Sequence, residues 1–118
     1  MNKLAIILTG TVSPSVKGGS FTPAERFDMY TSTLDFYART IGKSHPIFFF
    51  ENSNADLSKW ETVFKDTLDL TVMQFHPDTD EYTGFDNSKG KGYNEYLMIK
   101  KGISKIANYP PINKLHIS

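Results

Sequence analysis

The sequence predicts one α/β domain in which helices cover both faces of a mainly parallel sheet. Strand-like and helix-like patterns alternate along the chain as β-α-β-α-β-α, followed by the start of a further strand. Such alternation is typical of βαβ units with right-handed crossovers. The strand-like segments are apolar runs that suit strands buried on both faces. With 118 residues and no cysteine, the chain can form a single hydrophobic core and has no disulfide framework.

The first strand and the first helix have the clearest signals. Lys3–Thr9 is an almost continuous apolar run, and we expect it to be the central strand of the sheet. Thr22 and Glu25 form a capping box around Pro23, which predicts the start of a helix, and Gly42 is placed to end it. The predicted buried face of this helix consists of Phe27, Tyr30, Thr31, Leu34, Tyr37, Ala38 and Ile41.

The later elements follow the same alternation. Ile47–Phe50 consists of apolar residues with high strand propensity, and we expect a strand that leads into a polar turn. A short helix follows, for which Asn54 or Ser53 is the expected N-cap. Its buried face is predicted to consist of Leu57, Trp60 and Phe64. The remaining predicted elements are a strand at Leu70–Phe75, a helix that begins near Gly92 and continues through Ile106, and a strand that begins at Ile112.

Charge is balanced overall but uneven along the chain. The 13 basic and 13 acidic residues divide into five and three in residues 1–50, two and nine in 51–86, and six and one in 87–118. Two interpretations are open: solvated faces that differ in sign by chance, or a cationic loop for an anionic ligand. The balance argues against a polybasic nucleic-acid partner, and no apolar run is long enough for a membrane span. We therefore expect a cytoplasmic protein.

In open parallel sheets ligands bind at the carboxyl ends of the strands. This rule selects residues 9–20, 51–54 and 76–92. In the last of these, Asp78 and Asp80 flank one residue, and two such carboxylates can hold Mn²⁺ or Mg²⁺ against a diphosphate. The alternative is a solvated acidic loop.

Lys89, Gly90, Lys91 and Gly92 precede the last helix, where glycine backbone and the positive dipole end favour a phosphate. The segment is not a Walker A loop, and Glu95 stands where a dinucleotide motif has its third glycine. A glycine-rich turn with solvated lysines is the alternative, and a carboxylate such as Glu95 in a first helical turn is common without any function.

The turn after the second strand holds Glu51, Asn52 and Ser53. These residues could hydrogen-bond a sugar or base, or Glu51 could act as a general base. The alternative is that Asn52 and Ser53 cap a loop while Glu51 lies in solvent.

Four segments that span nearly the whole chain resemble the amino-terminal part of bacterial glycosyltransferase-like proteins of surface-polysaccharide synthesis. They are Leu4–Thr11 with Pro14 beyond it, Pro23–Arg26 with Tyr30 and Phe36–Tyr37, Pro46–Ser53, and Lys89–Glu95. The resemblance implies a nucleotide-diphospho-sugar transferase fold of the GT-A type, a Rossmann-like three-layer sandwich. It implies that Thr9, Gly10 and Thr11 lie near the nucleotide. Glu51 and Asn52 would lie near base or ribose, and Lys89–Gly92 with Glu95 near the diphosphate.

The implied activity is sugar transfer from a nucleotide donor to a saccharide acceptor in capsular or lipopolysaccharide synthesis. Two features depart from the family: the Asp78–Asp80 triplet follows Pro77 in a loop instead of closing a strand, and the chain has about half the usual length. We therefore expect residues 1–118 to be a domain that is incomplete at its carboxyl end, with no catalytic residue assigned. The alternative is a non-catalytic α/β binding or interaction module, with homo-oligomers formed through an open sheet edge.

Overall fold

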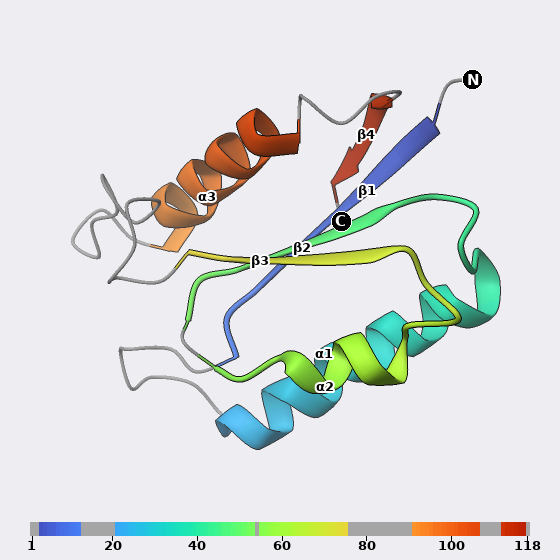
Figure 1. The fold of residues 1–118 in the computed structure, drawn as a ribbon. Coiled ribbons are helices and arrows are strands. Elements are labelled where there is room, and N and C mark those ends of the chain that lie inside the picture. Colours follow the sequence, from blue (N-terminus) through green and yellow to red (C-terminus); the bar gives the residue numbers. More distant parts are fainter. Residues whose placement is uncertain (1–2, 13–20, 54, 76–90, 107–111, 118) are drawn as a thin grey trace.

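The computed structural model describes residues 3–12, 21–53, 55–75, 91–106 and 112–117. Strands and helices alternate along these residues (Figure 1), which confirms the predicted α/β class. The elements are β1 (Lys3–Gly10), α1 (Pro23–Thr40), β2 (Ile47–Glu51), α2 (Ser58–Val63), β3 (Leu70–Gln74), α3 (Lys91–Ile106) and β4 (Ile112–Ile117).

The four strands form one sheet in the order β3-β2-β1-β4, and every neighbouring pair is parallel. β1 lies between β2 and β4, as predicted for the first strand. The register places Gly10 opposite Glu51, and Glu51 opposite Gln74. Since parallel strands end at the same edge, the last residues of β1, β2 and β3 form one row there.

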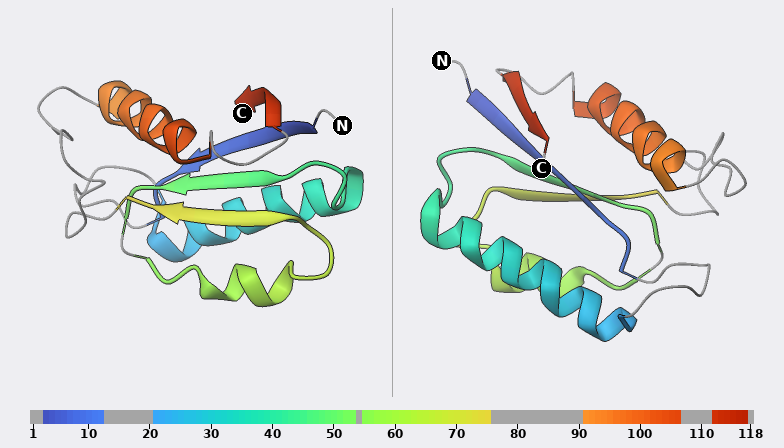
Figure 2. Two further views of the ribbon diagram at one scale, coloured as in Figure 1. Left: turned by 45° about the horizontal axis from the view of Figure 1, so that its top comes forward. Right: turned by 180° about the vertical axis from the view of Figure 1, so that it is seen from behind.

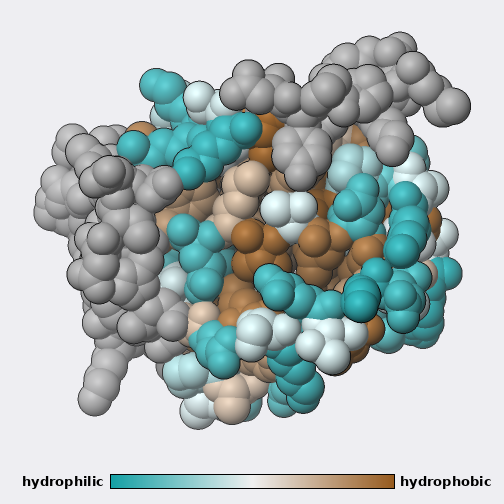
Figure 3. Space-filling model, viewed as in Figure 1, coloured by the Kyte–Doolittle hydropathy of each residue, from teal (hydrophilic) through white to brown (hydrophobic). Residues whose placement is uncertain are grey.

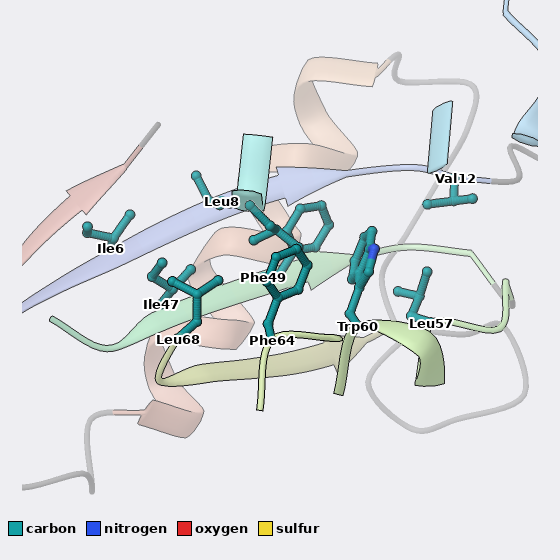
Figure 4. Close-up of a cluster of buried hydrophobic side chains, with 10 residues drawn as sticks. Ile6, Leu8, Val12, Ile47, Phe49, Leu57, Trp60, Phe64 and Leu68 are labelled. Atoms are coloured by element: carbon teal, nitrogen blue, oxygen red, sulfur yellow. The ribbon is translucent and has the colours of Figure 1, made fainter. Parts of the chain in front are cut away.

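Helices lie on both faces of the sheet, with α1 and α2 on one side and α3 on the other (Figure 2). Side chains alternate between the faces along each strand, and this divides the buried residues into two clusters. The cluster under α1 and α2 (Figure 4) consists of Ile6, Leu8, Val12, Leu34, Ile47, Phe49, Leu57, Trp60, Phe64 and Leu68. The cluster under α3 consists of Ala5, Ile7, Phe48, Phe50, Phe75, Met98 and Ile106.

α1 begins and ends at the predicted residues. The Glu25 N–H donates to Thr22 Oγ1 at 3.1 Å, and the Thr22 N–H donates to Glu25 Oε1 at 3.0 Å. The hydrogen bond from the Thr22 backbone, and then that with its hydroxyl, lowers the pKa of Glu25. After the helix Gly42 has φ +54°, and its N–H donates to the Tyr37 carbonyl at 3.1 Å. The left-handed conformation explains why glycine occupies this position.

The predicted cap of α2 is wrong. The helix begins at Ser58, with Leu57 as an N-cap that makes no side-chain hydrogen bond. Asp56 Oδ1 accepts from the Ser58 N–H at 3.0 Å instead. Ser53, one of the two expected caps, binds the buried carboxylate of Glu51, and the other, Asn54, lies outside the described residues. A buried carboxylate needs donors, and this need overrides local helix capping.

Candidate functional site at the carboxyl edge of the sheet

The candidate site is built on the row formed by Gly10, Glu51 and Gln74. The chain leaves the sheet after each of these residues. The segments that follow β1 and β2 are Thr11–Val12 and Asn52–Ser53. They lie side by side, and Thr11 and Asn52, which are 41 positions apart in the sequence, are hydrogen-bonded. Thr9, one residue earlier in β1, is half-buried opposite Phe50. The residues predicted after β1 and those predicted after β2 therefore belong to one site.

Glu51 is fully buried, and both of its carboxylate oxygens accept hydrogen bonds within the protein. Oε2 accepts from the Val12 N–H at 2.7 Å and from Ser53 Oγ at 2.5 Å. Oε1 accepts from the Ser53 N–H and from Gln74 Nε2, both at 3.0 Å. One carboxylate thus ties together the residues that follow β1 and β2 and the last residue of β3. This geometry favours a positioning role for Glu51 over that of a general base, which must reach substrate.

Thr11 and Asn52 are the half-buried polar residues of these two segments. Thr11 Oγ1 donates a short hydrogen bond to Asn52 Oδ1, and the Asn52 N–H donates to the Gly10 carbonyl at 3.3 Å. These bonds hold the amide group of Asn52 at the edge of the sheet. Its Nδ2 makes no hydrogen bond to any residue of the described chain, so within this part of the chain its two N–H groups are unpaired donors.

The beginning of α1 supplies two further residues that sequence reasoning missed as parts of a site. The Thr11 N–H donates to Tyr30 Oη at 3.2 Å, and Arg26 Nη1 donates to the Thr11 carbonyl at 3.2 Å. Arg26 Nε is buried and has no hydrogen-bond partner among the described residues. Gly10 allows the Tyr30 ring to lie this close to β1, because a Cβ at Gly10 would lie 2.8 Å from Tyr30 Cζ and 2.9 Å from Phe49 Cζ. The only local signal was an arginine one turn into the helix that follows the β1 loop.

The third predicted segment is described in part. The structure describes Lys91, Gly92 and Glu95, which belong to the first two turns of α3. Figures 1 and 2 show this end of α3 on the side of the sheet where β2 and β3 end. Lys89 and Gly90 lie outside the described residues, as do Asp78 and Asp80.

Two further properties bear on the chemistry. Within residues 3–12, 21–53, 55–75, 91–106 and 112–117, no group of three or more metal-ligating side chains is arranged to hold a metal ion. No helix of this part of the chain is long and apolar enough to cross a membrane.

Comparisons with known proteins leave the site to be interpreted from its geometry. The chain matches no protein-family model, no curated protein and no solved structure.

Proposed function

We propose that this chain is a glycosyltransferase-like domain that binds a nucleotide-diphospho-sugar at the carboxyl edge of its sheet, for sugar transfer in bacterial surface-polysaccharide synthesis. The observation that carries the proposal is the strand order. Chain connections run from β1 through β2 to β3 on one side, and then cross to β4 on the other side of β1. In open α/β sheets, the crevice at such a reversal is where nucleotides bind.

The strand order β3-β2-β1-β4 is also how a Rossmann-like, three-layer sandwich begins. In this proposal the four strands are the donor-side part of such a fold. α1 packs on one face and α3 on the other, and in such folds the ligand crevice lies where the connections diverge to the two faces.

The amino termini of α1 and α3, two of the helices that begin at this edge, differ in charge. In α1, the carboxylate of Glu25 already occupies the positive end of the helix dipole through the capping box. The first turn of α3 contains no acidic residue, and Glu95, expected there from the sequence, is the fifth residue of the helix. An added diphosphate is therefore favoured at α3, where Lys89–Gly92 would supply backbone N–H groups and two ammonium groups.

The nucleoside half of the ligand fits the β1–β2 side of the edge. The two N–H donors of the Asn52 side chain, which hydrogen-bond to no described residue, suit carbonyl and hydroxyl oxygens, which are abundant on ribose and on the bases. Thr9, Gly10 and Thr11 would line the approach, with Arg26 behind them. Asp78 and Asp80 would hold Mn²⁺ or Mg²⁺, which neutralises charge on the leaving diphosphate when bound.

The proposal is tested by ligand-dependent thermal stability. Uridine, guanosine or cytidine diphosphate, with and without Mn²⁺, is expected to raise the melting temperature, because a ligand that binds the native state stabilises it. The double variant K89A/K91A should weaken diphosphate binding by about tenfold or more, since charge-assisted hydrogen bonds are lost. A matched control, K59A/K100A, removes two charges at exposed lysines elsewhere and should bind normally.

Asn52→Ala tests the ligand contact. Loss of one or two neutral hydrogen bonds to the ligand should weaken nucleotide binding by about 3- to 10-fold. The melting temperature of the free protein should fall modestly as well, because the hydrogen bond from Thr11 Oγ1 to Asn52 Oδ1 is lost. Thr11→Val removes that same hydrogen bond but keeps the Asn52 amide, and should weaken nucleotide binding less. If no nucleotide changes the melting temperature of the wild-type chain, the transferase-like proposal is wrong and a non-catalytic interaction module becomes the better reading.

A further inference from the structure

β3 is an outer strand of the sheet in the described part of the chain, where its neighbour is β2. All five residues of β2 are buried, whereas Leu70, Thr71, Val72 and Met73 of β3 are half-buried and Gln74 is exposed. Figure 3 shows apolar side chains gathered where β3 crosses the view, with polar side chains above and below. An edge of this kind presents unpaired N–H and C=O groups that can accept a further strand.

Two hydrogen bonds show which backbone groups face outward. The Ile47 N–H donates to the Asp69 carbonyl at 2.8 Å, and the Phe75 N–H donates to the Glu51 carbonyl at 2.8 Å. Residues 69 and 75 therefore point their backbone groups toward β2. Because backbone direction alternates along a strand, Leu70, Val72 and Gln74 point theirs away from it.

The three residues with outward backbone groups, Leu70, Val72 and Gln74, are spaced symmetrically about Val72. This spacing suits antiparallel pairing with a strand of the same sequence. We propose that β3 pairs in antiparallel fashion with β3 of a second copy of this chain, around a two-fold axis at Val72. Val72 then faces Val72 of the second copy, and Leu70 faces Gln74. The strand has no charged residue, proline or glycine, so it lacks the usual sequence features that prevent edge pairing, and no like charges meet across the axis.

Charge beside the strand also favours a second copy. A groove of about 500 Å³ lies next to the beginning of β3 and has an apolar floor. The floor consists of Trp60, Phe64, Leu68 and Leu70, and the charged lining residues are Lys43, Lys65, Glu61 and Asp69. Two cations and two anions make the rim electrically balanced. Two identical rims can thus approach without net repulsion, whereas a strongly charged partner gains nothing there.

The test uses opposite charges at the axis. Light scattering across a concentration series should give twice the mass of one chain for the wild type. Val72→Lys and Val72→Glu should each be monomeric, because like charges would lie directly opposite each other. Mixed in equal amounts, the two variants should recover the dimer. Val63→Lys, which adds the same charge at a half-exposed position of α2, should remain dimeric, and circular dichroism checks that every variant is folded.

Amide hydrogen exchange locates the interface. The amides of Leu70, Val72 and Gln74 should exchange more slowly at concentrations where the dimer forms. A monomer at every concentration, or a dimer whose three amides exchange quickly, would overturn the proposal. Slow exchange in a monomer would show that another part of the same chain covers the edge, and would overturn it as well. None of these results depends on nucleotide binding.

Discussion

The two faces of the sheet are packed by different means. On the α1–α2 face, large aromatic rings fill the space: Phe27 stacks on Trp60 with centroids 5.2 Å apart, and Phe49 lies 5.0 Å from Trp60. On the α3 face, the helix approaches through a glycine. A Cβ at Gly102 would lie 2.3 Å from Phe50 Cε2, a distance that real contacts do not reach.

The difference matters because aromatic side chains with polar ends can link a core to a site. Trp60 Nε1 donates to Thr31 Oγ1 at 2.8 Å, and Tyr30, which packs edge-on against Phe49, accepts from the Thr11 N–H. The α1–α2 face therefore both stabilises the fold and holds the segment after β1. Close helix packing on the α3 face supplies dispersion contacts but no comparable polar link among the described residues.

The largest effect is expected from Trp60→Ala, which removes the centre of the α1–α2 face. A substitution of this kind typically costs about 3–5 kcal/mol, and here it also leaves Thr31 Oγ1 without its donor. Urea unfolding measures the loss. Trp60→Phe, the control, keeps most of the ring contact and should cost less. A loss below about 1 kcal/mol for the alanine variant would show that the aromatic packing is not what stabilises this face.

Gly102→Val tests the α3 face, with an intermediate effect. The added side chain overlaps the ring of Phe50, and such overpacking costs about 1–3 kcal/mol. Helix propensity alone predicts the opposite sign, since glycine is among the poorest helix formers. Urea unfolding of this variant therefore separates the two explanations. A stabilised protein would mean that α3 is not held against Phe50 by the glycine.

Thr22→Ala gives the smallest effect, about 1 kcal/mol for the loss of an N-cap, and should loosen α1 while leaving α3 unchanged. Hydrogen exchange at Leu34 and Met98 compares the two helices. Because the Thr22 hydrogen bonds lower the pKa of Glu25 in the folded state, their stabilisation is complete above the ordinary glutamate pKa. It is lost as the pH falls through the lowered value. The variant keeps the backbone N–H of residue 22, whose hydrogen bond is the larger cause, and loses only the hydroxyl, so it should lack the smaller part of this acid dependence. Loss of the whole dependence would contradict the assignment.

Local patterns were sufficient for much of the fold. The capping box at Thr22 and Glu25, the helix end at Gly42 and the central apolar strand all depend on residues within a few positions of one another, and each was predicted correctly. The carboxyl-edge rule also placed Thr11 and Asn52 in one region. Local reasoning failed at α2, where Ser53 was predicted to cap the helix.

The sequence by itself determined the alternation of elements, the buried faces of α1 and α2, and the segments that end at one edge of the sheet. Only the tertiary structure decided what Glu51 does, since the donors to its carboxylate come from the ends of three strands. It alone revealed Arg26 and Tyr30 beside Thr11, and the symmetric outward groups of β3. Helix caps and hydrophobic periodicity depend on residues that lie within a few positions of one another in the sequence. By contrast, the hydrogen-bond partners of the buried Glu51 side chain lie up to 39 positions away and meet only when the sheet assembles.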